Sequence, residues 1–247
     1  MKEDYPHLAD ETIEAKASEL LTQYSEWAKE AVSVPVPAEV IAEQFLGYEL
    51  DITNEGIFSD PDYMGGVLFN EHIIKINSAL ENHEGRYNFT IAHEIGHHVL
   101  HREHYIRQNE NQIMCRETGE KPMVEQQADR FAAALLMPEK NVREAFSLAT
   151  ANGSLPFAKP TTQALRALAA GVVAKGQFTN VSNTAMVNRL IDLRIVSGAR
   201  YQTGTPQDFY RRNGSAPGLN RQTFSWMMSW LLHPLKTFKQ IRNRKND

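Results

Sequence analysis

The chain has 247 residues, of which 42% are hydrophobic, and a formal net charge of −4 at pH 7. A chain of this length can bury a substantial core, as one domain with appendages or as two small domains. It has neither an apolar run behind a basic start nor the eighteen or more apolar residues of a membrane span, so neither a secreted nor a membrane protein is predicted. A single cysteine, Cys115, excludes an intrachain disulfide and favours the cytoplasm.

The first third of the chain predicts two helices and a small sheet. Apolar residues at helical spacing predict a long amphipathic helix from Glu11 to Val32. Pro35 and Pro37 end it and open a second helix over Ala38–Phe45. Short apolar segments bounded by turn residues then predict three strands, at Tyr48–Thr53, Gly66–Phe69 and Ile73–Ile76.

A third helix, expected near Phe89, contains the segment His93-Glu94-Ile95-Gly96-His97. Residues four apart lie on the same helix face, so His93 and His97 can direct an imidazole nitrogen at one metal ion. Glu94 is offset by about 100° from His93, which puts its carboxylate beside the ion as a base rather than a ligand. Gly96 costs about 1 kcal/mol of helix stability relative to alanine, which suggests a neighbour that packs closely there.

A catalytic zinc needs three protein ligands and one open position. A site that draws all three from one extended segment needs a histidine where this chain has Glu103, so that scheme is rejected. A ligand at His101, one turn beyond His97, would sit about 6 Å too far along the same straight helix. We therefore interpret three further histidines as packing or surface residues: His98, His101 and His104.

Beyond a predicted loop from Gln108 to Pro122, the segment Glu125–Leu136 predicts a second amphipathic helix, which Pro138 ends. Glu125 and Asp129 lie one turn apart on it, close to its apolar face. Glu125 would supply the third zinc ligand, and Asp129 would accept the free ring N–H of one histidine and so fix its tautomer. The alternative is a solvated helix start with ordinary acidic residues in its first turn.

Three segments, Gly66–Asn77, Arg86–His101 and Glu125–Pro138, closely resemble the ImmA/IrrE family of metallopeptidases. The predicted order of elements also fits the α+β class: a compact zincin-like metallopeptidase domain, with a small sheet packed by helices, followed by a C-terminal helical extension. The resemblance implies that His93, His97 and Glu125 bind one Zn²⁺ ion and that Glu94 is the catalytic general base.

The resemblance further implies a zinc-dependent endopeptidase of narrow specificity. Its substrate would be a helix-turn-helix (XRE-type) transcriptional repressor encoded nearby, whose cleavage releases genes of mobile elements or stress responses. The alternative is a binding regulator or toxin-antitoxin component that keeps the zinc fold without cleaving; Glu94 argues against it, because a structural metal needs no base. A hairpin strand, Gly65–Phe69, is expected to hold the substrate by strand addition. Three side chains are candidates to stabilise the oxyanion: Tyr63, Tyr87 and His101.

Three domains are predicted. Residues 1–150 form a metallopeptidase domain, and residues 151–200 form a helical segment that resembles a piece of a helix-turn-helix. Residues 201–247 form a basic tail with a short amphipathic segment. In the second, Thr161–Ala174 and a segment capped by Ser182 predict helices. A helical pair packed under the peptidase domain is the favoured interpretation, and DNA reading is the alternative.

Charge divides unevenly along the chain. Residues 1–193 carry 16 basic and 28 acidic side chains, whereas residues 194–247 carry 10 and 2. The basic tail holds an aromatic and apolar run, Phe224–Pro234, that is too short to span a bilayer. Three interpretations stay open for it: docking on the body as a helix, contact with an anionic membrane surface, or contact with nucleic acid or the repressor complex.

Overall fold

The computed structural model of the chain describes residues 6–60, 62–108, 110–116, 122–150 and 161–196. All of them belong to one compact unit, Met1–Thr205. The predicted connector around residues 152–160 and the predicted basic tail at 201–247 lie outside the described residues.

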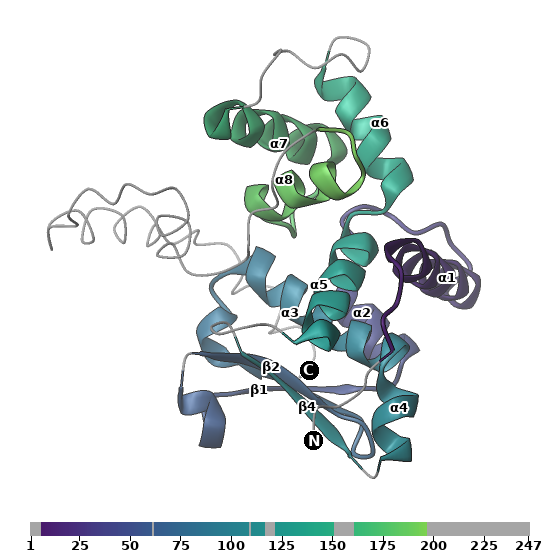
Figure 1. Cartoon of the computed structure of the whole chain (residues 1–247), viewed down its shortest axis with the longest axis vertical. Coiled ribbons are helices and arrows are strands. Elements are labelled where there is room, and N and C mark those ends of the chain that lie inside the picture. Colours follow the sequence, from purple (N-terminus) through teal and green to yellow (C-terminus); the bar gives the residue numbers. More distant parts are fainter. Residues whose placement is uncertain (1–5, 61, 109, 117–121, 151–160, 197–247) are drawn as a thin grey trace, which may run out of the picture. The chain divides into compact units, whose positions relative to one another are not determined.

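A mixed four-stranded sheet forms one layer (Figure 1). Its strand order is β1-β3-β2-β4, with β1 parallel to β3 and β2 antiparallel to both β3 and β4. The strands are β1 (Glu49–Thr53), β2 (Tyr63–Leu68), β3 (Ile73–Asn77) and β4 (Gln112–Arg116).

Helices pack on this sheet and on one another, with α3 and α5 side by side above the sheet and α1 beside α5 (Figure 1). The predicted fold class, a compact α+β zincin-like domain, is confirmed. The helices are α1 (Asp10–Ala28), α2 (Ala38–Val40, continued by a π-helical turn, Ile41–Phe45), α3 (Glu84–Leu100), α4 (Arg102–Arg107), α5 (Met123–Leu136), α6 (Glu139–Ala149), α7 (Thr162–Gly176) and α8 (Asn183–Asp192).

The core that supports α3 comes from alternating residues of the sheet and one face of the helix. Ile74 and Ile76 are two apart on β3, so their side chains point to the same face. They belong to the same fully buried cluster as Ile91 and Ile95 of α3, which are four residues apart on one helix face. This packing holds α3 against the sheet. The helix contains three of the predicted site residues, His93, Glu94 and His97.

Three element boundaries differ from the sequence prediction. Helix α1 ends at Ala28 rather than Val32, because Lys29 adopts the left-handed conformation (φ 58°) and its N–H bonds back to the Ser25 carbonyl. Helix α3 begins at Glu84, five residues before Phe89. The segment predicted as a loop from Gln108 to Pro122 contains β4.

The prediction that Gly65–Phe69 receives a substrate as an added strand is wrong. The strand β2 pairs with β3 on one side and with β4 on the other. Both rows of its backbone groups face a neighbouring strand, so no extended peptide can join it. Among the described residues, β1 and β4 are the strands at the edges of the sheet.

The two C-terminal helices begin as the sequence predicts. The Ser182 hydroxyl caps α8 by accepting the Ala185 N–H at 3.1 Å, and Thr161 caps α7 by accepting the Ala164 N–H at 3.1 Å. Helix α7 packs against α6 and α8. A role for this segment in reading DNA stays a prediction. No helix in the described part of the chain is long and apolar enough to cross a membrane.

Candidate metal centre

The two helices that carry the predicted site touch at Gly96. A Cβ atom added to Gly96 would lie 3.2 Å from both the Cα and the carbonyl oxygen of Ala128 on α5, and 3.3 Å from Cβ of Phe131. These contacts confirm the expectation that something packs closely against this glycine. The close approach brings the first turns of α5 beside the third and fourth turns of α3.

Three donor atoms converge where the helices meet. Nε2 of His93 and Nε2 of His97 lie 3.0 Å apart. The Glu125 carboxylate lies 3.1 Å from His93 Nε2 through one oxygen and 3.3 Å from His97 Nε2 through the other. All three residues are buried, and within the described residues they are the group of side chains placed to hold a metal ion.

The Asp129 carboxylate determines which nitrogen of His93 faces the centre. It lies 3.0 Å from Nδ1 of His93, so Nδ1 carries the proton and donates to it. Nε2 of the neutral ring then presents a lone pair toward the Glu125 oxygens and the second imidazole. Lone pairs directed at one point repel one another unless a cation lies between them.

The spacing of these donors fits a divalent ion. A tetrahedral zinc with ligands at about 2.0–2.1 Å leaves its donor atoms about 3.3 Å apart, close to the observed separations. Two imidazole nitrogens and one carboxylate oxygen are a ligand set that leaves the fourth position of a tetrahedral ion open. The residues therefore fit a catalytic type of metal site.

The protonation states of the buried side chains also suit a cation. Burial alone would raise the pKa of the Glu125 carboxyl, but the hydrogen bonds and charges of His93 and His97 hold it well below its usual value. Burial lowers the pKa of His97. An ionised carboxylate and a neutral imidazole are the forms that ligate a metal.

Glu94 lies next to this group and is fully buried. In the described part of the chain, neither of its carboxylate oxygens has a hydrogen-bond partner. Burial raises the pKa of Glu94 to about 8, with His93 lowering it and Glu125 raising it further. A buried carboxyl group without a hydrogen-bond partner lowers stability, so its position beside the three donors points to a role at this site.

Sequence reasoning missed two polar residues behind His97. Its Nδ1 lies 3.0 Å from Nδ1 of His101, and Nε2 of that ring lies 2.9 Å from Oε1 of Gln127. His101 is outside the group of donors, as predicted, yet it contacts one of them. The signal was present in the sequence, since His101 follows His97 by one helical turn and Gln127 lies between Glu125 and Asp129.

Two further histidines in the described part of the chain bond to other side chains. Nδ1 of His98 forms a hydrogen bond with the Tyr48 hydroxyl at 2.9 Å, and Nε2 of His104 forms one with the Gln108 side chain at 2.7 Å. Two of the three oxyanion candidates bond to other side chains. Tyr87 is hydrogen-bonded to Glu39, and both ring nitrogens of His101 are engaged.

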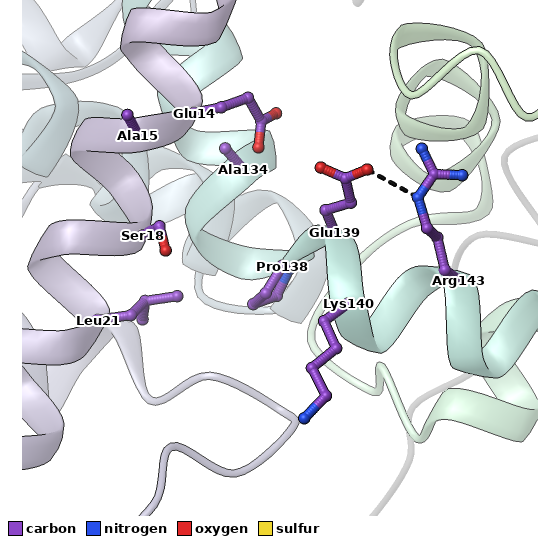
Figure 2. Close-up of a pocket in the computed structure, with 9 residues that line it drawn as sticks. All are labelled: Glu14, Ala15, Ser18, Leu21, Ala134, Pro138, Glu139, Lys140 and Arg143. Atoms are coloured by element: carbon purple, nitrogen blue, oxygen red, sulfur yellow. Dashed lines mark hydrogen bonds and ion pairs between the residues drawn. The ribbon is translucent and has the colours of Figure 1, made fainter.

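A separate surface pocket lies between α1, α5 and α6 (Figure 2). Its walls include Glu14 of α1 and the pair Glu139 and Arg143 of α6, which are 2.7 Å apart. None of its lining residues belongs to the group of donors, so it is not part of the metal centre.

A small mixed sheet with a buried His-Glu-x-x-His helix, crossed by a second helix that contributes a carboxylate, defines a zincin-like metallopeptidase domain. Residues 49–150 match the family model described as Peptidase_M78, the IrrE N-terminal-like domain. This stretch, less than half of the chain, is therefore similar to the ImmA/IrrE family of metallopeptidases. No curated protein matches the chain at a significant level.

Proposed function

We propose that the protein is a zinc-dependent endopeptidase and that Glu94 is its general base. The observation that carries the proposal is the buried Glu94 carboxylate, unpaired among the described residues and adjacent to three converging donors. A site that held metal for structure alone would need no such group, and its burial would only destabilise the fold. This observation favours an enzyme over a binding regulator or toxin-antitoxin component that merely retains the fold.

Each side chain has a defined task in this proposal. His93, His97 and Glu125 hold the ion, and Asp129 keeps the His93 proton on Nδ1. When bound, zinc supplies a Lewis acid for the peptide carbonyl and lowers the pKa of water. Glu94 accepts the proton of the attacking water and then gives it to the leaving amine, so it ends the cycle as it began.

A helix-turn-helix (XRE-type) repressor encoded nearby is the proposed substrate. Support for it comes from the similarity of residues 49–150 to the ImmA/IrrE family, and the basic side chains of residues 194–247 offer a means of contacting nucleic acid or the repressor complex. Such a substrate places the reaction in the cytoplasm and makes its outcome the release of repressed genes.

The test measures metal content and cleavage of the helix-turn-helix protein encoded beside this gene. The wild-type protein should bind one zinc ion and cleave. Glu94→Gln should retain zinc and lose about 10²- to 10⁴-fold in rate, the usual contribution of a positioned general base. Glu125→Ala should lose the metal and the activity together, because the two imidazoles that remain are too few ligands to hold the ion.

Glu103→Gln is the matched control, since Glu103 lies on α4 with its side chain 86% exposed. It should cleave like the wild type. Removal of zinc with a chelator should abolish cleavage, and added zinc should restore it. A Glu94→Gln protein that still cleaves, or a wild-type protein that never holds metal, would exclude the proposed enzyme.

A further inference from the structure

Three hydrogen bonds connect His97 to the N-terminal segment of the chain. Nδ1 of His97 is 3.0 Å from Nδ1 of His101, and Nε2 of His101 is 2.9 Å from Oε1 of Gln127. Nε2 of Gln127 donates to the carbonyl oxygen of Pro6 at 3.2 Å. His97, His101 and Gln127 are all buried, so water does not compete for the first two contacts, whereas the contact of Gln127 with the exposed Pro6 is partly buried.

The direction of each bond follows from the last one. A backbone carbonyl only accepts, so the side-chain amide of Gln127 must turn its NH₂ group toward Pro6 and its oxygen toward His101. An amide oxygen also only accepts, so Nε2 of His101 carries a proton. Nδ1 of the neutral His101 ring is then an acceptor, and the proton shared with His97 belongs to His97 Nδ1.

We propose that Gln127 and His101 are positioning residues that fix the tautomer of His97, and that the Pro6 carbonyl sets the direction of the whole chain of bonds. With its proton held on Nδ1, His97 presents the lone pair of Nε2 to the ion. This inference rests on the proposed metal site, because the tautomer matters only if His97 is a ligand.

The two histidines are thus held by different chemistry. His93 donates to the Asp129 carboxylate, which carries a negative charge, whereas His97 donates through a neutral ring to a neutral amide. A ligand histidine that donates to an anion is more basic than one that donates to a neutral acceptor. The arrangement also makes the metal centre dependent on a segment that precedes α1, more than 100 residues away from Gln127 in sequence.

The tautomers can be read directly by nuclear magnetic resonance of the ring nitrogens in the metal-free wild-type protein. The expected result is a proton on Nε2 and none on Nδ1 of His101, together with a proton on Nδ1 of His97. A His101 ring with its proton on Nδ1 would overturn the proposal. This measurement requires neither metal nor substrate, so it stands even if the proposed peptidase activity fails.

Variants of Gln127 test whether the chain of bonds supports the ion. Gln127→Leu removes the acceptor and should weaken zinc affinity about 10- to 100-fold, the range found when the partner of a ligand histidine is lost. Gln127→Glu restores an acceptor for His101 and should recover most of that affinity. The matched control is Gln126→Leu, an exposed residue on the same helix, which should bind zinc like the wild type.

Zinc affinity is measured by competition with a chelator, beside the unfolding midpoint of each metal-free variant. Weak binding in Gln127→Leu with recovery in Gln127→Glu supports the proposal. Equal loss of affinity in both variants, matched by equal loss of stability, would show that Gln127 only fills space. Wild-type affinity in Gln127→Leu would show that His97 needs no orienting partner, and would leave the proposed peptidase intact.

Discussion

Gly65 shows how little space surrounds the Glu94 carboxylate. A Cβ atom at this position on β2 would lie 2.6 Å from Cγ2 of Thr90 and 3.0 Å from Oε1 of Glu94. The carbonyl oxygen of Lys75, on the neighbouring strand, would be 3.1 Å away. The sheet can therefore approach Thr90 and Glu94 of α3 this closely only because residue 65 has no side chain.

Gly65→Ala should displace the Glu94 carboxylate and lower the rate of cleavage about 10²-fold, as misplacement of a reacting group by about 1 Å does. Overpacking should also lower the free energy of unfolding by about 1–3 kcal/mol. The metal content should not change, because no donor atom is touched. Cleavage rate, zinc content and denaturant unfolding give the three readouts.

The double variant Gly65→Ala, Thr90→Ser separates the two effects. It removes the Thr90 methyl group, which makes the shortest contact, and leaves the contact with Glu94. Stability should largely return while the rate stays low. Recovery of both together would show that Gly65 serves packing alone and does not position the base.

Individual residues were predictable where a fixed spacing along one helix determines the chemistry. His93, Glu94 and His97 follow from the helical repeat, and Glu125 and Asp129 share one face of a second helix. The polar chain behind His97 and the space at Gly65 depend on contacts between elements far apart in the sequence. No periodicity within a single element indicates such contacts.

The spacing between α3 and α5 is set where Gly96 meets the backbone of Ala128. The two atoms nearest to an added Cβ, each at 3.2 Å, are main-chain atoms of α5, so a methyl group must push the helix itself. Glu125 and Asp129 lie on either side of Ala128 along that helix. Any shift of α5 therefore moves the third donor and the partner of His93.

Gly96→Ala should weaken zinc affinity several-fold, although alanine favours a helix by about 1 kcal/mol over glycine. Gly171→Ala in α7 is the matched control, because its Cβ would be 3.7 Å from the nearest atom, Cβ of Ala149. The control should raise stability by about 0.4–1 kcal/mol and leave zinc affinity unchanged. Unfolding curves and chelator competition on both variants decide the question. A Gly96→Ala protein that gains stability like the control and binds zinc normally would contradict the proposed constraint.

At the scale of elements, long periodic segments were recognised and the short strand β4 was not. The predicted helices over Ala38–Phe45 and Glu125–Leu136 lie close to their observed bounds. The strand Gln112–Arg116 is five residues long and its partner, β2, lies more than 40 residues earlier. Such pairing is invisible to local patterns, and missing it also led to the wrong assignment of β2 as an edge.

A buried arginine joins three parts of the described molecule. Arg189 of α8 is 1% exposed; its Nε donates to the Met137 carbonyl, between α5 and α6, at 2.8 Å. Both Nη atoms bond to the carboxylate of Glu14 on α1. Glu14 also lines the surface pocket of Figure 2, and its side chain is 35% exposed. The C-terminal helices, which lie beyond the matched family domain, are thereby tied to the first helix of the chain.

The two partners of this ion pair should respond unequally to substitution. Glu14→Leu leaves a buried guanidinium without its counter-charge and should lower the free energy of unfolding by about 3 kcal/mol. Arg189→Met leaves a carboxylate that water can reach, and should lower it by about 1–2 kcal/mol. The double variant should lose less free energy of unfolding than the sum of the two single variants, because neither charge is then left unpaired.

Arg107→Met supplies the comparison, because the pair of Arg107 with Glu103 on α4 is exposed. Its loss should stay below about 0.5 kcal/mol, as for other exposed pairs one helical turn apart. Denaturant unfolding of the four variants measures all these differences. Additive losses in the double variant would mean that Arg189 and Glu14 act separately. A strong coupling would instead make the C-terminal helices part of the cooperative unit that holds α1 against α5, the helix of the third zinc ligand.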